Sequence, residues 1–340
     1  MNVAIIGAGS FAAGVHAPAF AQMKNVCLVA VCSPNKQKAM DVASRFGIKA
    51  VYTDHLEMFA KEDLDAVTIC TPNCYHSQIA IDALHRGIHV FCEKPDAVSV
   101  AEAERMQEAA QRNNRVLMVM RNNRFTAMAT YLKKFIENGG LGEVYAATCG
   151  WQRRRGIPGS GWFTSKDLAG GGPLIDLGVH MIDLAMWLMG NPKPTTVSGC
   201  TYMKFLNDGI PEKGKYDVED LATGFIRFAN QACLQFECSW ASNIKYDEYA
   251  YLEFRGTKAG AVWNSKDKVL TLCSCENGQS INFTPDISEE VPAHRANIQH
   301  FMDVITKHVE PIITPQQGVD MIKVLESIYK SAETGREVVL

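Results

Sequence analysis

The sequence predicts an α/β protein in which a doubly wound parallel sheet is followed by a second domain of α+β type. In the first 120 residues, short continuous apolar runs alternate with helical patterns, as is typical of βαβ units. Between residues 196 and 283 the chain instead contains strand-like segments of mixed polarity separated by turns, which favours an antiparallel sheet. The pattern changes after Arg121, so we expect domains at residues 1–121 and 122–340.

The composition excludes several classes of protein. The chain has 340 residues, of which 47% are apolar and 21% charged, and this composition excludes a disordered or fibrous protein. Its length is typical of two domains. Thirty-four basic and 37 acidic residues give a net charge of −3, so no general attraction to nucleic acid or a membrane surface is expected. No apolar run approaches the roughly 18 residues of a membrane span, and the start lacks a basic segment, so we expect a cytoplasmic protein.

The elements of the first domain follow from its apolar runs and helix caps. Five runs are continuous rather than alternating, as strands buried on both faces of a parallel sheet should be. They are residues 3–6, 27–32, 66–70, 88–92 and 116–120. Asp54 followed by Glu57, and Ser99 followed by Glu102, are capping-box patterns that predict helix starts.

The second domain should open with a helix at 125–138, a strand at 144–151 and a helix at 174–189. Turns are expected at Asn207-Asp208-Gly209 and Arg255-Gly256-Thr257. Two helices close the chain, and the last has a capping box formed by Thr314 and Gln317. The eleven cysteines include no C-x-x-C pair, so neither a disulfide nor a metal site is predicted.

The first strand leads directly into Gly7-Ala8-Gly9-Ser10-Phe11-Ala12, which matches the dinucleotide-binding pattern G-x-G-x-x-G/A of Rossmann-type domains. Gly7 permits a tight turn, Gly9 lets the backbone approach a pyrophosphate, and Ala12 allows close helix-to-strand packing. The phosphates would lie at the helix N-terminus. A plain strand-to-helix turn is the alternative, but the position after residue 6 of a βαβ chain favours a cofactor site.

The end of the second strand bears on which dinucleotide binds. An Asp or Glu usually stands there and binds the ribose hydroxyls, but here the segment is Ser33-Pro34-Asn35-Lys36-Gln37-Lys38. Without a carboxylate a 2′-phosphate is not repelled, and Lys36 or Lys38 supplies positive charge. The sequence therefore slightly favours NADP over NAD, while solvated lysines on a helix face remain an alternative of nearly equal weight.

Further polar residues follow later strands, at the sheet edge where open α/β proteins bind ligands. They are Thr71-Pro72-Asn73 with His76, Glu93-Lys94-Pro95, and Arg121 to Arg124. A lysine in an apolar setting near a cofactor can take part in proton transfer, which singles out Lys94. As a lone tripeptide, Glu-Lys-Pro is equally compatible with an exposed turn.

The predicted helix at 174–189 carries Asp176, His180 and Asp183 at the spacing i, i+4, i+7, which places them on one face. A histidine between two carboxylates is arranged for tuned basicity. The same three groups are a conceivable metal site, but one helix with two carboxylates and one histidine lacks the usual ligand set. Acid/base chemistry is favoured and no metal is predicted.

The segment Arg153-Arg154-Arg155 leads through a glycine-rich stretch to Trp162. In a strand, Arg153 and Arg155 share one face and Arg154 lies on the other. Two interpretations carry equal weight: a solvated basic strand end, or a mobile lid that stacks Trp162 on a sugar ring and directs arginines to its hydroxyls or a carboxylate.

Taken together, these motifs resemble the glucose-fructose oxidoreductase, inositol dehydrogenase and MocA (Gfo/Idh/MocA) family over essentially the full chain. The matching residues are Gly7 to Ala12 with His16, Thr71-Pro72-Asn73 with His76, Glu93-Lys94-Pro95, and Gly170-Gly171-Gly172 through His180 with Asp183. The resemblance implies an NAD(P)-dependent enzyme acting on a sugar, cyclitol or related secondary alcohol. It also implies a second domain with a large, open, mostly antiparallel sheet whose exposed face makes homodimers or homotetramers.

The resulting site prediction is specific. We expect the cofactor to contact Gly7, Gly9, Ser10, Phe11, Ala12, Ser33, Lys38, Thr71, Pro72, Asn73, His76, Glu93 and Lys94. We expect the substrate to contact Arg124, Arg155, Trp162, Asp176 and His180. The resemblance implies that Lys94, Asp176 and His180 line the substrate site, where we expect catalysis. The missing acid at Ser33 departs from NAD-specific members.

The predicted reaction is hydride transfer between nicotinamide C4 and a carbinol carbon of the substrate. His180 would act as general base in oxidation and as acid in reduction, Lys94 would stabilise the developing alkoxide, and Asp176 would orient a hydroxyl or His180. Two alternatives remain: a dinucleotide-sensing regulatory protein on the same scaffold, and a glycosidase that retains its NAD. The proton-transfer set argues against the first, and Lys94 argues against the second.

Overall fold

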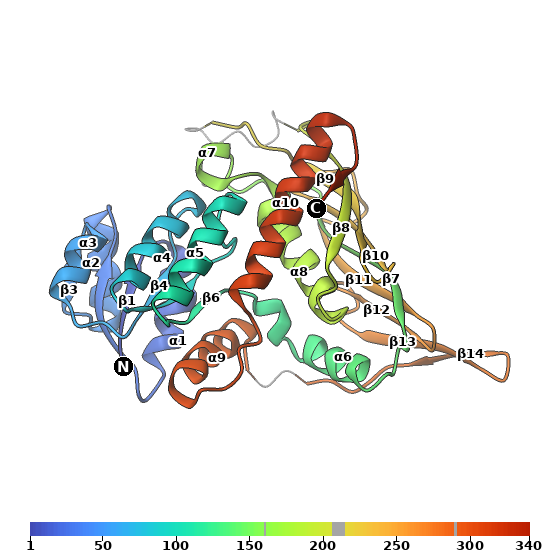
Figure 1. Cartoon of the computed structure of the whole chain (residues 1–340), viewed down its shortest axis with the longest axis horizontal. Helices are drawn as coiled ribbons and strands as arrows, with labels where there is room; N and C mark the ends of the chain where they lie inside the picture. The colour runs from blue at the N-terminus through green and yellow to red at the C-terminus, as the bar shows by residue number, and fades with distance from the viewer. Residues whose placement is uncertain (160, 206–214, 289–290) are drawn as a thin grey trace. The chain divides into compact units, whose positions relative to one another are not determined.

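The computed structural model describes residues 1–159, 161–205, 215–288 and 291–340 and divides the chain into two compact units (Figure 1). The first unit comprises Met1–Asn122 and Val291–Ile322, and the second comprises Asn123–Glu290 and Lys323–Leu340. The turn expected at Asn207-Asp208-Gly209 lies outside the described residues. Within the described residues, no helix combines the length and apolar character needed to cross a membrane.

The division of the chain differs from the expected one at its C-terminal end. The chain passes from the first unit to the second after Asn122, one residue from the expected boundary. Residues 291–322, however, return to the first unit. Two buried contacts account for that return. The backbone N–H of Arg121 donates to Asn297 Oδ1 at 2.7 Å, and the rings of Phe91 and Phe301 pack with centroids 5.2 Å apart.

The first unit is built on a six-stranded, entirely parallel sheet in the order β3-β2-β1-β4-β5-β6. Its strands are β1 (Asn2–Ile6), β2 (Cys27–Cys32), β3 (Ala50–Tyr52), β4 (Ala66–Ile69), β5 (His89–Cys92) and β6 (Leu117–Val119). Almost every residue of β1, β4 and β5 is buried, because helices cover both faces of the sheet. The predicted doubly wound fold is confirmed, and five of its six strands were expected.

The strand that sequence analysis missed is β3. It is only three residues long, and all three are half-buried, so it lacks the continuous buried character that marked the others. Its position at the edge of the sheet explains both properties, since an edge strand has a neighbour on one side only.

Most helices of the first unit connect successive strands, and the last of them lies in the returning residues 291–322. They are a π-helical turn (Ala12–His16), α1 (Ala17–Ala21), α2 (Lys36–Phe46), α3 (His55–Lys61), a 3-10 turn (Asn73–Tyr75), α4 (His76–His85), α5 (Val100–Arg112) and α9 (Ala293–Lys307). Helix α1 contacts α2 and α9, while α4 contacts α3 and α5. Asp54 and Ser99 cap α3 and α5 as predicted, because their side chains accept hydrogen bonds from first-turn N–H groups.

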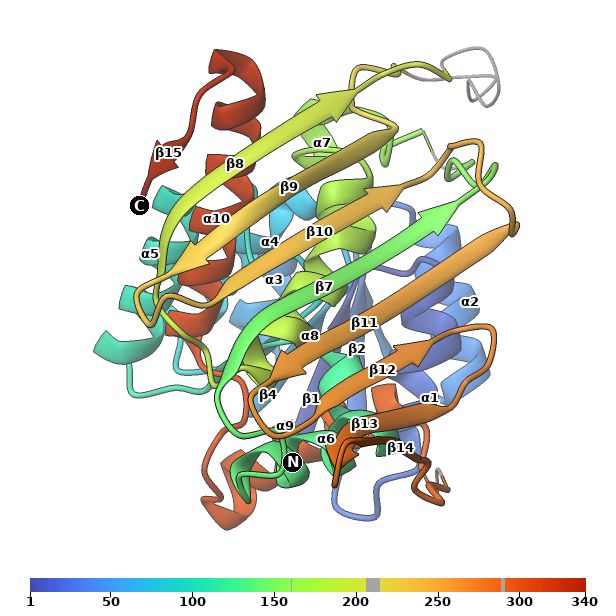
Figure 2. The same ribbon diagram turned by 90° about the vertical axis from the view of Figure 1, so that its right-hand side faces the viewer.

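The second unit contains a nine-stranded sheet in the order β14-β13-β12-β11-β7-β10-β9-β8-β15 (Figure 2). Its strands are β7 (Val144–Arg153), β8 (Pro194–Tyr202), β9 (Leu221–Phe228), β10 (Cys233–Ser239), β11 (Glu248–Gly256), β12 (Gly260–Asn264), β13 (Leu270–Glu276), β14 (Gln279–Phe283) and β15 (Val338–Val339). Only β7 and β10 pair in parallel, so the sheet is mostly antiparallel, as predicted.

One face of this sheet is covered by helices. They are a 3-10 turn (Asn122–Phe125), α6 (Ala127–Glu137), α7 (Lys166–Ala169), a π-helical turn (Leu174–Gly178), α8 (Val179–Leu188) and the end of α10 (Pro315–Thr334). Helix α8 packs on β7 and α6 on α8, and both lie behind the sheet in Figure 2. The opposite face carries no helix among the described residues of this unit.

Two helix beginnings confirm one prediction and correct another. Thr314 and Gln317 form a reciprocal capping box, in which each side chain accepts from the other residue's N–H at 3.4 and 3.3 Å. The helix expected at 174–189 is instead a π-helical turn continued by α8. The wider turn shifts the helical phase, so simple i, i+4 counting does not describe the start of this segment.

Candidate functional site

The strand-to-helix turn after β1 has the geometry that a pyrophosphate requires. Gly7 has a φ of +97°, and a Cβ there would lie 2.3 Å from the carbonyl oxygen of Cys70, so only glycine fits. A Cβ at Gly9 would meet no atom within 4 Å, so open space faces the backbone at that point. Ala12 is fully buried beneath the turn, while Ser10 and Phe11 are exposed at the start of the helical segment. These residues fit a dinucleotide phosphate group.

The loop after β4 offers a further group that fits a ligand. Thr71 Oγ1 is buried and has no hydrogen-bond partner among the described residues. Leaving a buried hydroxyl unpaired costs free energy, so a bound cofactor that bonds to it would remove that cost. Pro72 begins the short 3-10 turn, and Asn73 is buried within it.

His76 joins the loops that follow β4 and β5. Its Nδ1 lies 2.9 Å from the carbonyl oxygen of Pro95, and its Nε2 lies 3.0 Å from that of Thr71. The ring is fully buried, and this burial lowers the pKa of His76 below its ordinary value despite the two carbonyl partners. The ring therefore holds the Thr71 loop against the Lys94-Pro95 segment.

His16 and Glu93 form a buried pair between the glycine turn and Lys94. His16 Nε2 lies 2.7 Å from Glu93 Oε1, and its Nδ1 lies 2.7 Å from Thr68 Oγ1. Burial opposes the charged imidazole, but contacts with Cys70 and Glu93 outweigh it and raise the pKa of His16 to about 10. Glu93 Oε2 accepts the backbone N–H of Lys94 at 3.2 Å, so the pair fixes the backbone that carries this half-buried lysine.

The end of β2 carries a neutral hydroxyl where a carboxylate is common. Ser33 is buried, and its Oγ accepts the N–H of Asn35 at 3.3 Å. Asn35 caps α2 by accepting the N–H of Lys38 at 3.0 Å. The side chains of Lys36 and Lys38 are both exposed in the first turn of α2.

In the second unit, the segment leading into α8 displays two polar side chains from an otherwise buried stretch. Every residue from 171 to 188 is buried except Asp176 and His180. Asp176 Oδ2 accepts the indole N–H of Trp240 at 3.0 Å, and the His180 ring packs beside Trp151 with centroids 5.9 Å apart. The segment thus presents one carboxylate and one imidazole, a pair suited to moving a proton and orienting a hydroxyl.

Asp183 does not share the exposure of these two residues. It is buried and accepts two hydrogen bonds from Arg124, from Nε at 2.8 Å and from Nη2 at 2.7 Å. Asp183 is therefore held in the interior, whereas Asp176 and His180 are half-buried. Since Asp176 and Asp183 both already accept side-chain hydrogen bonds, the alternative of a metal site on this helix is also disfavoured.

Sequence reasoning missed Glu219, which secures the start of this segment. Its buried carboxylate accepts the N–H groups of Gly172 at 3.0 Å and Leu174 at 3.1 Å, and the hydroxyl of Tyr329 at 2.9 Å. Burial raises the pKa of Glu219, while these donors act in the opposite direction. The one available signal was an acidic pair, Glu219-Asp220, directly before an apolar strand.

Two further expected substrate residues, Arg155 and Trp162, contact side chains outside the segment that leads into α8. Arg155 is exposed, stacks over the ring of Phe205 at 4.3 Å and donates to Asn243 Oδ1 at 3.1 Å. Trp162 stacks on Phe163 with ring centroids 3.8 Å apart. Neither contact links these side chains to Asp176 or His180.

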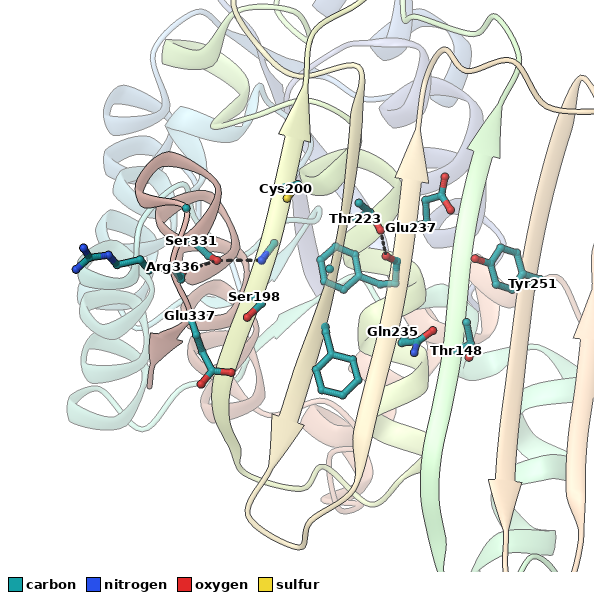
Figure 3. Close-up of a pocket in the computed structure, with 15 residues that line it drawn as sticks. Thr148, Ser198, Cys200, Thr223, Gln235, Glu237, Tyr251, Ser331, Arg336 and Glu337 are labelled. Atoms are coloured by element: carbon teal, nitrogen blue, oxygen red, sulfur yellow. Dashed lines mark hydrogen bonds between the residues drawn. The ribbon is translucent and has the colours of Figure 1, made fainter.

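The uncovered sheet face also has a hollow, of about 520 Å³ (Figure 3). Polar side chains such as Thr148, Ser198 and Gln235 line it, together with Glu237 and Tyr251. Burial raises the pKa of Glu237 above its ordinary value. None of the expected cofactor or substrate residues contributes to this hollow, so it does not belong to the predicted site.

The fold and these groups define a nicotinamide-dependent oxidoreductase: a dinucleotide-binding unit joined to a unit that presents a carboxylate and an imidazole. Comparison with known proteins agrees. The model of the "Oxidoreductase family, NAD-binding Rossmann fold" matches residues 1–121, and that of the "Oxidoreductase family, C-terminal alpha/beta domain" matches residues 133–340. The chain belongs to this oxidoreductase family, the Gfo/Idh/MocA family.

Individual relatives cover nearly the whole chain. A D-glucoside 3-dehydrogenase of Escherichia coli (strain K12) is 34% identical over 100% of this chain and 97% of its own. A scyllo-inositol 2-dehydrogenase (NAD(+)) of Bacillus subtilis (strain 168) is 28% identical over 92% and 88%. The structure of a levoglucosan dehydrogenase in complex with NADH superimposes with a TM-score of 0.89 at 26% identity, covering 100% and 98% of the two chains.

Proposed function

We propose that this enzyme transfers a hydride between a nicotinamide cofactor and a secondary alcohol or ketone of a sugar, cyclitol or related polyol. The observation that carries the proposal is that, along the stretch 171–188, Asp176 and His180 alone are half-buried while every other residue is buried. The dinucleotide turn at Gly7 and Gly9 supports it, as do the sugar and inositol dehydrogenases among the relatives. When bound, the cofactor accepts or supplies the hydride.

The chain's own residues handle the proton and the developing charge. His180 takes the hydroxyl proton at an imidazole nitrogen during oxidation and returns it during reduction. Lys94 hydrogen-bonds the same oxygen through Nζ and stabilises its negative charge. Asp176, held by the indole N–H of Trp240, orients a neighbouring hydroxyl or His180 itself.

Alanine variants of the proton-transfer residues test this assignment. His180→Ala and Lys94→Ala should each lower kcat by roughly 10² to 10⁴, the usual worth of a general acid/base or an oxyanion donor. Cofactor affinity, measured by fluorescence titration, should change far less. His85→Ala, at an exposed position in the last turn of α4, is the matched control and should leave both unchanged. Near-wild-type turnover of either site variant on a polyol substrate would falsify the mechanism.

Three further side chains are proposed to serve the substrate. Arg155 and Trp162 are proposed to contact it directly, through hydrogen bonds and ring stacking respectively. Arg124 is proposed to act indirectly, by fixing the position of α8, because its Nε and Nη2 both donate to Asp183 on that helix. Trp162→Ala should therefore raise KM more than it lowers kcat, and an unchanged KM would remove Trp162 from the site.

We also propose that NADP(H) binds at least as tightly as NAD(H). Ser33 offers no carboxylate to repel a 2′-phosphate, and Lys36 and Lys38 are exposed just beyond it. Fluorescence titration of both cofactors provides the test, and Ser33→Asp should shift the preference toward NAD(H). A tenfold wild-type preference for NAD(H), about 1.4 kcal/mol, would contradict the proposal.

Finally, we propose that the enzyme is a homodimer or homotetramer assembled through the uncovered sheet face. That face bears Phe225 and a stacked row of Tyr246, Tyr249 and Tyr251, with ring centroids 5.4 Å apart, beside the hollow of Figure 3. A broad sheet face that exposes aromatic rings is typical of a self-association surface. Light scattering should give a mass well above the 37.5 kDa monomer, and a clean monomer would overturn the proposal.

A further inference from the structure

The second unit contains a cavity of about 940 Å³ that the proposed mechanism does not use. Its floor is the helix-bearing face of the sheet, and its walls come from α6, α8 and the segment after β14. Neither Asp176 nor His180 lines it. The cavity is nevertheless adjacent to the polar pair, because its lining residue Trp151 packs against His180 and its lining residue Met181 follows His180 in sequence.

The register of the sheet explains why space exists there. On the helix-bearing face, Trp151 of β7 lies opposite Ala250 of β11, and Leu252 of β11 lies opposite Trp263 of β12. The two tryptophans thus stand on either side of β11 and are staggered by two residues along it, so that their Cα atoms are roughly 12 Å apart. Ala250, the partner of Trp151, presents only a methyl group to the cavity that it lines. Figure 2 shows β7, β11 and β12 side by side.

The lining has the mixed chemistry of a site for an amphipathic ring. Two indole rings and Met128 offer apolar surface, while Glu248, Lys266 and Asn123 offer charged and polar groups. Glu248 is already oriented, since Trp151 Nε1 and Arg153 Nε donate to its Oε1 at 2.7 and 2.8 Å. Apolar walls with a few placed polar groups are the usual composition of small-molecule sites, which occupy about 300 to 1,000 Å³.

We propose that this cavity is a second-ring subsite, which binds the glycosidic substituent of a substrate whose first ring reacts at His180. The inference rests on the proposed function and adds to it the substrate class: a disaccharide or similarly substituted glycoside rather than a free monosaccharide. The second ring stacks between the two tryptophans and places its hydroxyls near Glu248 and Lys266. Binding energy gained there, away from the reacting carbon, holds the first ring in place for the reaction.

Matched substrate pairs test the subsite. The kcat/KM of methyl α-glucoside is compared with that of maltose, and methyl β-glucoside with cellobiose, because each pair differs by a second ring. At least one disaccharide should exceed its methyl glycoside by tenfold or more. The subsite is overturned if the disaccharides are used no better than both methyl glycosides. It is also overturned if the disaccharides do not react while monosaccharides or cyclitols do. Either result leaves the proposed function standing. Absence of turnover with every sugar and cyclitol would instead contradict the proposed function.

Two variants locate the effect. Trp263→Ala removes one stacking surface, and Ala127→Trp fills the cavity from the first turn of α6 without removing any core side chain. Each should cut the disaccharide advantage to about twofold while the methyl glycoside rate stays within about twofold of wild type. Thr130→Trp, an exposed position on the same helix that does not line the cavity, is the control. If Ala127→Trp and the control slow both substrates of a pair equally, the cavity is not the subsite.

Discussion

The two units hold their functional side chains in opposite ways. In the first, buried side chains fasten loops: His16 and Glu93 tie the glycine turn to Lys94, and His76 bonds the carbonyls of two strand-end loops. In the second, the buried side chains of Glu219 and Arg124 hold the segment that includes α8. Asp176 and His180 are the residues of the stretch 171–188 that are not fully buried. The proposed cofactor site therefore depends mainly on the position of the backbone, whereas the proposed proton-transfer site depends on which side chains a rigid element presents.

The largest effect should come from breaking the ion pair behind α8. Arg124→Met leaves Asp183 buried without its partner, since the two side chains are 1% and 4% exposed. Removing one member of such a pair costs about 3 to 5 kcal/mol of unfolding free energy. Urea unfolding measures the loss, and Glu108→Gln, which breaks an exposed pair with Arg112, should stay within about 0.5 kcal/mol. A loss below 1 kcal/mol for Arg124→Met would mean that the helix is not held in this way.

The corresponding pair in the first unit should show a distinctive pH dependence. The pKa of His16 is raised to about 10, so its stabilisation is complete below about pH 6.5 and is lost as pH rises through 10. The pKa of Glu93 is lowered by His16 despite burial, so its contribution is lost when pH falls below about 4.3. His16→Asn should cost about 3 kcal/mol at pH 6 and progressively less toward pH 10. Unfolding both proteins at pH 6, 8 and 10 tests this; a pH-independent difference would show that His16 is uncharged.

Substitution of Glu219 should lower the unfolding free energy less than the two changes above, and it should also lower kcat. Glu219→Gln retains the shape but turns an amide N–H toward one of three donors, at a cost of about 1 to 3 kcal/mol. Because Gly172 and Leu174 then loosen, kcat should fall while cofactor affinity is retained. Glu333→Gln, at an exposed position in the last turn of α10, serves as the control. Unchanged kcat would show that Asp176 and His180 do not depend on this anchor.

The smallest effect should come from a helix cap whose hydrogen bonds involve neither set of groups. Asp54 accepts the N–H groups of Leu56 and Glu57 at the start of α3. Asp54→Ala should lower the unfolding free energy by about 1 kcal/mol and leave kcat and cofactor affinity unchanged. Thermal unfolding and initial rates provide the measurement. A change in kcat here would mean that the effects above reflect general destabilisation rather than the site.

The sequence predicted the first unit better than the second, for physical reasons. Buried parallel strands need unbroken apolar runs, and a dinucleotide turn needs glycines at set positions, so both leave local patterns. The exception was β3, whose three half-buried residues resemble any short loop. For the second unit, an antiparallel sheet with several helices was expected but the strand order was not, because strand order arises from contacts distant in sequence.

The supports of the candidate site were the least predictable part. Glu219 lies 47 residues from Gly172, and Arg124 lies 59 residues from Asp183, so no local spacing could connect them. The burial of Asp183 could not be read from the spacing i, i+4, i+7, because it accompanies the pairing of its carboxylate with the distant Arg124. The pairing of His16 with Glu93 is equally non-local, although both residues stand in recognisable motifs.

The glycines before α8 limit where this scaffold can acquire new specificity. A Cβ at Gly171 would lie 1.9 Å from the Tyr329 hydroxyl, and one at Gly172 would lie 2.1 Å from the carbonyl oxygen of Glu219. Random mutagenesis of this stretch should therefore return mostly misfolded protein, whatever selection is applied. The wall of the neighbouring cavity, with the exposed residues Lys266 and Lys268, has no such restriction. Directed evolution toward a different sugar or polyol should find its productive mutations there, with helix α8 left intact.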